Sequence, residues 1–265
     1  MRFRGVLAAG LALALAACTG EEITETAAVP APAGPAEIRV LTVGGTRTAM
    51  EALQAQYEAS SGNTLIISFN NPLLIEELMV DEEFDVIIAA NNSVNVARDA
   101  NMLEPGTQRK LSRTGIGLSI REGADMPDIS TPDAFRETLL NADSIALTNP
   151  SNPNGSGIHT EKILGYAGIY GEVMAKATIH GLGDGKALIA EGERDLGLFN
   201  ISEATAPGVV YVGPVPAVWQ LYTNYDVAII ADSNVKEAAA DLVAFLASAE
   251  AQANWNAGGI DLIAE

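Results

Sequence analysis

A glycine pair followed by a polar cluster is the first stretch of this chain whose residue types suit a chemical task. The apolar run 38–43 ends in Gly44-Gly45, and Thr46 and Arg47 come next, at the start of a helical pattern. Unpaired backbone N–H groups at a helix start attract anions, and a guanidinium adds a planar set of donors. The stretch therefore indicates an anion-binding turn. Its alternative is an ordinary strand-to-helix turn with a solvated arginine.

A second polar loop precedes a helical pattern later in the chain. The apolar run 143–147 is followed by TNPSNPNGSG, and the helical pattern starts at Ile158. Ser156 and Gly157 lie where a helix begins, so they can donate hydrogen bonds to an anion. A flexible loop with a serine cap explains the same residues.

The elements that position these turns follow from hydrophobic periodicity. Short apolar runs alternate with helical patterns, which predicts βαβ units, a parallel sheet and an α/β fold. Ligands of such sheets gather at the carboxyl ends of the strands. Polar residues end several of the runs, including a turn at 91–93, and the secondary contacts that we expect there are Asn71, Asn200 and Ser202.

Catalytic and metal-binding patterns are weak in this sequence. The two histidines, His159 and His180, and the single cysteine do not have the spacing of a zinc site, and no G-x-S-x-G motif occurs. Residues 181–187 lack the spacing of a phosphate-binding loop and read as a loop before a helix. We expect no catalytic residue, no metal, no cofactor and no enzymatic activity. His159 either reaches the ligand or covers the helix surface.

Aromatic residues gather near one late strand. Trp219, Tyr222 and Tyr225 either stack on an organic ligand or pack between two halves of the molecule, and packing is the expectation for each.

The charge balance limits the possible partners. The formal net charge is −19 and 48% of the residues are hydrophobic, so the chain should fold around a core and should not bind nucleic acid. Because the overall field repels anions, an anion site needs locally concentrated donors.

The N-terminus has the features of a secretory signal. Arg2 and Arg4 precede an apolar segment at 6–17 that is too short to span a bilayer. The residues around Cys18 resemble the signal of bacterial lipoproteins, in which the cysteine is lipidated; a plain secreted protein is the alternative. We therefore predict a lipoprotein signal peptide at 1–17 and a disordered tether at 18–37. One cysteine excludes an internal disulfide.

Beyond the tether, the chain resembles bacterial periplasmic substrate-binding proteins of the molybdate-binding kind. The resemblance runs from residue 38 to the C-terminus, through IRVLTVGGTRTAMEALQAQY, FDVIIAANNSVNVARDANML, GIHTEKIL, DLGLFNISEA, YDVAII and VKEAAADLVAFLASAEAQANW. It implies a two-lobed type II fold, with βαβ lobes joined by crossing strands around a ligand cleft. Lobe 1 would comprise 38–115 plus 221–265, and lobe 2 would comprise 116–220.

The resemblance also implies a ligand site, from which this sequence departs. Gly45 stands where the family has a serine, Asn71 lies at a turn that usually carries one, and Asn200 replaces a tyrosine. Ser156 stands at a position that offers its backbone in the family.

Two charged residues change the expected chemistry of that site. Arg47 is an addition, because molybdate sites of this family use neutral donors, and a guanidinium suits a carboxylate or phosphonate. Asp184 suits a cationic or hydroxyl-rich part of a ligand. The ligand is therefore a molybdate-like oxyanion, a small organic anion or a zwitterion.

The resemblance implies a monomeric periplasmic lipoprotein that passes a small anionic solute to an inner-membrane ABC permease. The alternative is a periplasmic lipoprotein of the same fold that binds a protein partner.

Overall fold

The computed structural model describes residues 34–71, 74–151, 155–181 and 184–263. The predicted signal peptide, Cys18 and nearly all of the tether lie outside the described residues.

The first half of the chain begins with three parallel strands. β1 lies between β2 and β3, and pairs with both. The three strands are β1 (Glu37–Val43), β2 (Thr64–Asn70) and β3 (Val86–Ala90). All of β3 is buried, as expected of a central strand that is covered on both faces.

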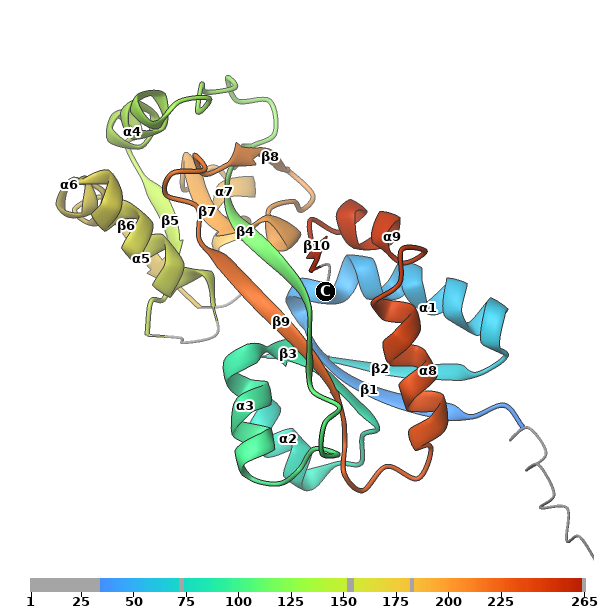
Figure 1. Cartoon of the computed structure of the whole chain (residues 1–265). Coiled ribbons are helices and arrows are strands. Elements are labelled where there is room, and N and C mark those ends of the chain that lie inside the picture. The colour runs from blue at the N-terminus through green and yellow to red at the C-terminus, as the bar shows by residue number, and fades with distance from the viewer. Residues whose placement is uncertain (1–33, 72–73, 152–154, 182–183, 264–265) are drawn as a thin grey trace, which may run out of the picture. The chain divides into compact units, whose positions relative to one another are not determined.

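The helices between these strands cover the sheet (Figure 1). They are α1 (Arg47–Ser61), α2 (Ile75–Asp81) and α3 (Asn91–Asp99). In α1, Met50, Leu53 and Tyr57 recur at helical spacing and are buried. The helix stops at Gly62, whose φ of 75° is left-handed, a conformation that glycine adopts without steric cost.

Two long strands lead from this half of the sheet to the other. β4 (Arg109–Arg121) pairs antiparallel with β9 (Tyr222–Ile229) through its first seven residues, and its remaining residues pair with β7 and β8. Figure 1 shows β4 and β9 side by side between the two parts. They are the crossing strands that the resemblance implied.

The second half repeats the parallel arrangement. β5 lies between β6 and β7 and is parallel to both. The elements here are α4 (Pro132–Asn141), β5 (Ile145–Thr148), α5 (Ser156–Ala167), α6 (Tyr170–Met174), β6 (Ala177–His180), α7 (Asp184–Ala190), β7 (Leu196–Asn200) and β8 (Val209–Pro214).

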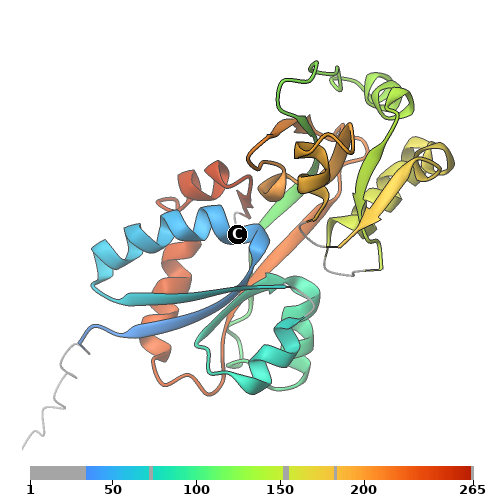
Figure 2. The same cartoon turned by 180° about the vertical axis from the view of Figure 1, so that it is seen from behind.

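The chain ends on the first half. α8 (Lys236–Leu246) and α9 (Gln252–Ala257) lie beside α1, as Figure 2 shows from behind, and β10 (Asp261–Leu262) pairs with the start of β4. Trp255 on α9 is fully buried.

Two hydrophobic clusters form the main cores of these halves. One joins β1, β3 and β9 to α1 and α8, and the other joins β5 and β7 to α4 and α5. Along β4 the first cluster contains Leu111 and the second begins with Ile116. The predicted α/β, two-lobed architecture is confirmed. The division at 38–115 plus 221–265 against 116–220 stays a prediction, since it concerns which residues move together.

Several predicted element boundaries are wrong. Residues 91–93 form the first turn of α3 rather than a loop, and Asp184 begins α7 rather than ending a loop. β6 was not predicted, because only His180 of its four residues is buried and the strand lies at the edge of the sheet.

Gln220 holds the point where β4 passes from one half to the other. Its Oε1 accepts from the Ile116 N–H at 2.8 Å, and its Nε2 donates to the Ile116 carbonyl at 2.8 Å. The side-chain amide of Gln220 thus bonds the backbone N–H and carbonyl of Ile116, as a neighbouring strand would, at the point where β4 changes its partner from β9 to β7.

We expect Gln220→Ala to lower the free energy of unfolding by about 1–3 kcal/mol, because the Ile116 N–H loses its partner in a half-buried setting. Urea denaturation measures the change. Gln252→Ala removes an exposed amide whose one hydrogen bond, to Asn256, is 3.4 Å long, and should cost less than about 0.5 kcal/mol. Equal losses in the two variants would contradict this role for Gln220.

Candidate ligand-binding site

The turn after β1 presents backbone rather than side chains. η1 (Gly44–Thr46) links β1 to α1. The Thr46 side chain is buried, where its Oγ1 lies 2.8 Å from the Thr42 Oγ1 and donates to the Val43 carbonyl at 2.9 Å. Thr46 can therefore serve a ligand only through its backbone N–H, as the first residues of a helix commonly do.

Arg47 lies at the carboxyl end of β2. Its guanidinium carbon is 4.0 Å from the ring centroid of Phe69, and its Nη1 donates to Glu51 Oε1 at 3.3 Å. The side chain is 52% exposed, so the ion pair with Glu51 is weak. The ring fixes the plane of the guanidinium, and within the described residues its other donors have no hydrogen-bond partner. Asn71 follows the same strand and is exposed.

Gly45 lies against the turn that follows β7. A Cβ at this position would be 2.7 Å from the Tyr225 Oη, 3.5 Å from the Ser202 Oγ and 3.7 Å from the Glu203 Cδ. We call Gly45, Asn200, Ser202, Glu203 and Tyr225 the first-turn cluster. The tyrosine hydroxyl occupies the space that a side chain on residue 45 would need, which explains the glycine.

Hydrogen bonds fix the far side of the cluster. Asn200 Nδ2 donates to Glu203 Oε2 at 3.1 Å, and Asn200 Oδ1 accepts from the Thr223 Oγ1 at 3.2 Å. Asn200 is buried, so its amide positions Glu203.

The backbone of the turn after β7 is held by β4. This turn is η3 (Ile201–Glu203), and the Ser202 N–H donates to the Thr114 Oγ1 at 3.2 Å. The Thr114 hydroxyl in turn donates to the Gly259 carbonyl at 2.9 Å. η3 is therefore tied to the first half of the molecule, although β7 belongs to the second.

Tyr225 stays protonated in this setting. Burial raises its pKa, the negative charge of Glu203 raises it further, and the nearby Ser202 hydroxyl lowers it in part. The net pKa lies well above the ordinary range of a phenol, so the hydroxyl remains a donor at neutral pH.

The start of α5 packs directly on the end of β5. Ser156 is buried and its Oγ donates to the Thr148 Oγ1 at 3.0 Å. A Cβ on Gly157 would lie 2.4 Å from the Thr148 carbonyl oxygen, so only glycine allows this approach.

The two histidines sit near these strand ends. Burial, helped by the charge of Lys162, lowers the pKa of His159, which is therefore neutral at pH 7. His180 ends β6, where its Nδ1 donates to the Gly181 carbonyl at 2.6 Å. Within the described residues, His159 Nδ1 and His180 Nε2 are buried without a hydrogen-bond partner. Asp184 is exposed at the first residue of α7.

The sheet brings several predicted residues to one edge. Because β5, β6 and β7 are parallel neighbours, Ser156, Gly157, Asp184, Asn200 and Ser202 all follow strand ends of the same edge. At η3 this edge meets Gly45, so the carboxyl ends of β1 and β7 are in contact.

Two residues of the cluster were missed by the sequence analysis. Tyr225 was noted only as an aromatic residue near a late strand, and Glu203 was not singled out. The only signal available for Glu203 was its position within the stretch DLGLFNISEA, and nothing in the sequence ties either residue to Gly45.

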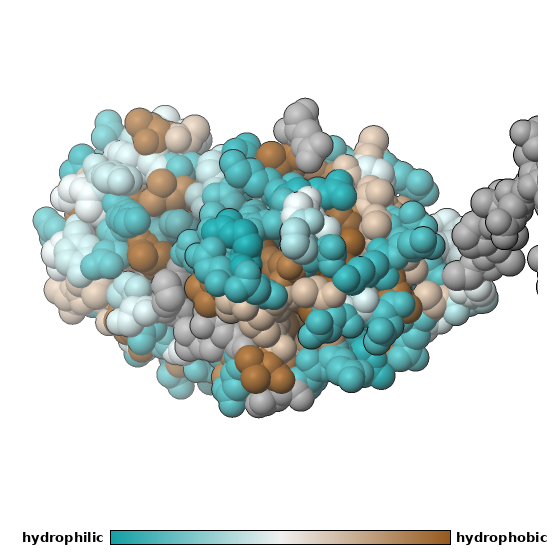
Figure 3. Space-filling model, turned by 60° about the horizontal axis from the view of Figure 1, so that its bottom comes forward, coloured by the Kyte–Doolittle hydropathy of each residue, from teal (hydrophilic) through white to brown (hydrophobic). Residues whose placement is uncertain are grey.

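Metal and membrane features were also sought in the structure. Among the described residues no group of three or more His, Cys, Asp and Glu side chains could hold a metal ion. No helix in that part of the chain is both long and apolar enough to cross a bilayer. In Figure 3 hydrophilic residues cover most of one face, and hydrophobic residues appear in separate small areas.

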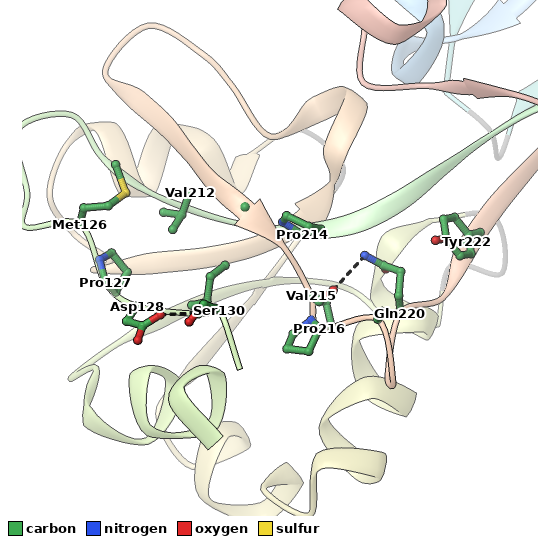
Figure 4. A pocket seen from close by; sticks show the side chains of 13 residues that line it. Met126, Pro127, Asp128, Ser130, Val212, Pro214, Val215, Pro216, Gln220 and Tyr222 are labelled. Carbon is green, nitrogen blue, oxygen red and sulfur yellow. Dashed lines mark hydrogen bonds between the residues drawn. The ribbon is translucent and has the colours of Figure 1, made fainter. Parts of the chain in front are cut away.

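A pocket of about 550 Å³ lies away from the predicted site. It is lined by residues 126–130, 212–217, Gln220 and Tyr222. Of these, the sequence analysis considered only Tyr222 as a possible ligand contact, and packing was its expected role. Figure 4 shows two hydrogen bonds in this pocket: the Ser130 N–H donates to the Asp128 carboxylate, and the Gln220 amide donates to the Val215 carbonyl. Its polar groups thus mainly serve the structure.

The paired parallel units and the two crossing strands form the two-lobed fold of periplasmic binding proteins. Solved structures with this fold match nearly the whole folded part. The periplasmic molybdate-binding protein of Azotobacter vinelandii has a TM-score of 0.69 at 18% identity, covering 86% of this chain and 99% of that chain. A substrate-binding domain assigned to a molybdenum ABC transporter of Clostridium difficile has a TM-score of 0.72 at 16% identity, covering 86% and 100%.

The chain belongs to the family of bacterial extracellular solute-binding proteins, whose model matches residues 38–261. A relative in sequence is an aconitate isomerase from a Pseudomonas species. It is 30% identical over 222 residues, which cover 81% of this chain and 83% of the relative. The predicted resemblance to molybdate-binding proteins of the type II fold is confirmed at the level of family and fold.

The contact between Gly45 and Tyr225 predicts a specific coupling. Gly45→Ala should cost about 1–3 kcal/mol in unfolding free energy, because its Cβ would crowd the tyrosine hydroxyl. In a Tyr225→Phe background the destabilisation caused by Gly45→Ala should be smaller by about 1 kcal/mol or more. Once the hydroxyl is gone, the nearest atom to the new Cβ is the Ser202 Oγ at 3.5 Å, an ordinary contact distance. Urea denaturation of the four proteins gives both values.

Gly44→Ala is the control for this cycle, because a Cβ there would meet no atom within 4 Å. The same cost for Gly45→Ala in both backgrounds would show that Tyr225 does not set the identity of residue 45.

Proposed function

We propose that this protein is a periplasmic solute-binding lipoprotein that captures a small anion for an ABC importer. The observation that carries the proposal is the meeting of the β1 and β7 ends at Gly45, with the Arg47 guanidinium at the neighbouring end of β2. Membership of the solute-binding family supports the class of function. The lipid anchor rests on Cys18 and its surrounding residues alone.

The anionic part of the solute would bind the turn before α1. Backbone N–H groups at Gly45 and Thr46 supply neutral donors, and Arg47 supplies a charge that can bind two oxygens at once. From the second lobe, Ser156 and Gly157 would present the start of α5. Asn71, Asp184, Asn200 and Ser202 complete the proposed set, with Asn200 acting through Glu203.

A small organic anion fits this set better than a molybdate-like ion. The family's serine is replaced by Gly45, whose side-chain space is filled by Tyr225, and a guanidinium is added. A planar guanidinium suits a carboxylate. The relative named aconitate isomerase points in the same direction, since aconitate is a small tricarboxylate.

Solute binding would close the two lobes about β4 and β9, the hinge motion of periplasmic binding proteins. The closed protein, acting as a monomer, would then dock on an inner-membrane permease.

Arg47→Ala should weaken the binding of a carboxylate solute about tenfold or more, because a charged hydrogen bond is lost. A thermal-shift screen of carboxylates and oxyanions selects the solute, and calorimetric titration measures its affinity. Arg39→Ala is the matched control: Arg39 also makes one 3.3 Å ion pair, with Glu37, and its side chain is 50% exposed. It lies towards the opposite end of β1.

An equal change in affinity for Arg47→Ala and Arg39→Ala would remove Arg47 from the site. If no anion shifts the melting temperature and a protein co-purifies with the chain, the alternative of a protein-binding lipoprotein would replace the transport proposal. A saturating ligand at about 100 times its dissociation constant should add about 2.7 kcal/mol, so the screen is sensitive enough to decide.

A second candidate function is isomerisation of an unsaturated polycarboxylate. The relative named aconitate isomerase favours it, and so does the pairing of a carboxylate, Glu203, with a protonated hydroxyl, Tyr225, at the proposed site. A carboxylate can accept a proton and a phenol can donate one.

Incubation with trans-aconitate, followed by proton NMR, separates the two functions. For a binding protein without catalysis we expect trans-aconitate to remain unchanged at protein concentrations that bind it. If the wild-type protein converts trans-aconitate to the cis isomer and Glu203→Gln does not, the protein is an isomerase instead.

A further inference from the structure

Glu203 places a negative charge beside the turn that is proposed to bind an anion. Its carboxyl carbon lies 3.7 Å from the position of a Cβ on Gly45, and its side chain is half-buried. A second anion placed here would be repelled, and the repulsion is larger in a partly buried site than in bulk water. The capture of an anion therefore does not by itself explain a glutamate at this position.

The carboxylate is held in one orientation and keeps one oxygen available. Oε2 accepts the Asn200 amide at 3.1 Å, and Asn200 is itself fixed by Thr223 at 3.2 Å. Within the described part of the chain, Oε1 has no hydrogen-bond partner. An ionised carboxylate oxygen only accepts hydrogen bonds, so Oε1 calls for a donor.

The groups around Glu203 are hydrogen-bond donors, so they favour an acceptor on the ligand. The hydroxyl of Tyr225 remains protonated, and the backbone N–H groups of Gly45 and Thr46 are donors. A ligand that spans this cluster would meet donors on one side and an acceptor a few ångströms away. It must carry a negative charge and, next to it, a hydrogen that it can donate.

We propose that Glu203 makes the site selective for anions that bear a hydroxyl beside the charged group, such as 2-hydroxy acids. Fully deprotonated tetrahedral dianions such as molybdate and sulfate would be rejected, because they bring only acceptors to Oε1. This inference rests on the proposed function, since it assigns the solute class of that same site.

Binding of matched ligand pairs tests the selectivity. Malate, in both enantiomers, differs from succinate only by a hydroxyl, and phosphate in neutral buffer keeps a proton that sulfate lacks. Calorimetric titration of the folded protein should show about a tenfold or greater preference for one malate enantiomer over succinate, and for phosphate over sulfate.

Glu203→Gln is the decisive variant because it keeps the shape and can still accept from Asn200, while it turns the other oxygen into a donor. It should reduce both preferences to less than about threefold, mainly by strengthening succinate and sulfate. Glu51→Gln removes the same formal charge next to Arg47 and should change the two members of each pair alike.

The outcomes separate this inference from the function on which it rests. If none of the four probes and no other carboxylate or oxyanion binds, the proposed function fails. If anions bind but the preferences survive in Glu203→Gln, only the selectivity inference is overturned. A wild-type preference for succinate and sulfate overturns it without any variant, so the test does not depend on the variant's folding.

Discussion

The contact between the turn after β1 and the turn after β7 is the constraint on which the rest of this structure depends. These turns belong to separate halves of the sheet, yet the hydroxyl of Tyr225 fits where Gly45 has no side chain. Thr114 then joins η3 to the turn at Gly259: it accepts a hydrogen bond from the Ser202 N–H and donates one to the Gly259 carbonyl. The first-turn cluster is thus also fixed by β4 and by the turn after α9. The ends of two parallel units are thereby held together at the place where α/β folds bind ligands.

The crossing strands make that contact possible. β4 is 13 residues long and changes partner half-way, from β9 to β7 and β8. Where a strand changes partner its backbone groups risk being left unpaired, and Gln220 supplies the replacement bonds at Ile116. Each half keeps its own hydrophobic cluster, so the link is narrow, and this arrangement suits hinge motion between two lobes.

Charge is handled locally in this acidic molecule. With a formal net charge of −19, the global field disfavours an anionic solute, so the proposed anion binding would depend on the donors around Arg47. The ring of Phe69 orients the guanidinium, and the exposed carboxylate of Glu51 offsets little of its charge. In the proposed site, Glu203 would add discrimination between anions at the cost of some attraction. Such a balance suits a protein that must select one solute from many anions.

The sequence by itself determined the α/β class and the turn around Gly45, because hydrophobic periodicity and glycine turns are local signals. The two-lobed architecture came from the resemblance to a known family. The sequence analysis failed at the edge strand β6, which has too few buried residues to show a pattern, and at the first turns of α3 and α7, where polar residues begin helices. Only the tertiary structure decided that Tyr225 fills the space beside Gly45 and that Glu203 faces it. Those residues are about 180 and 160 positions from Gly45 in the chain, and their meeting depends on how the sheet is ordered, which no local pattern records.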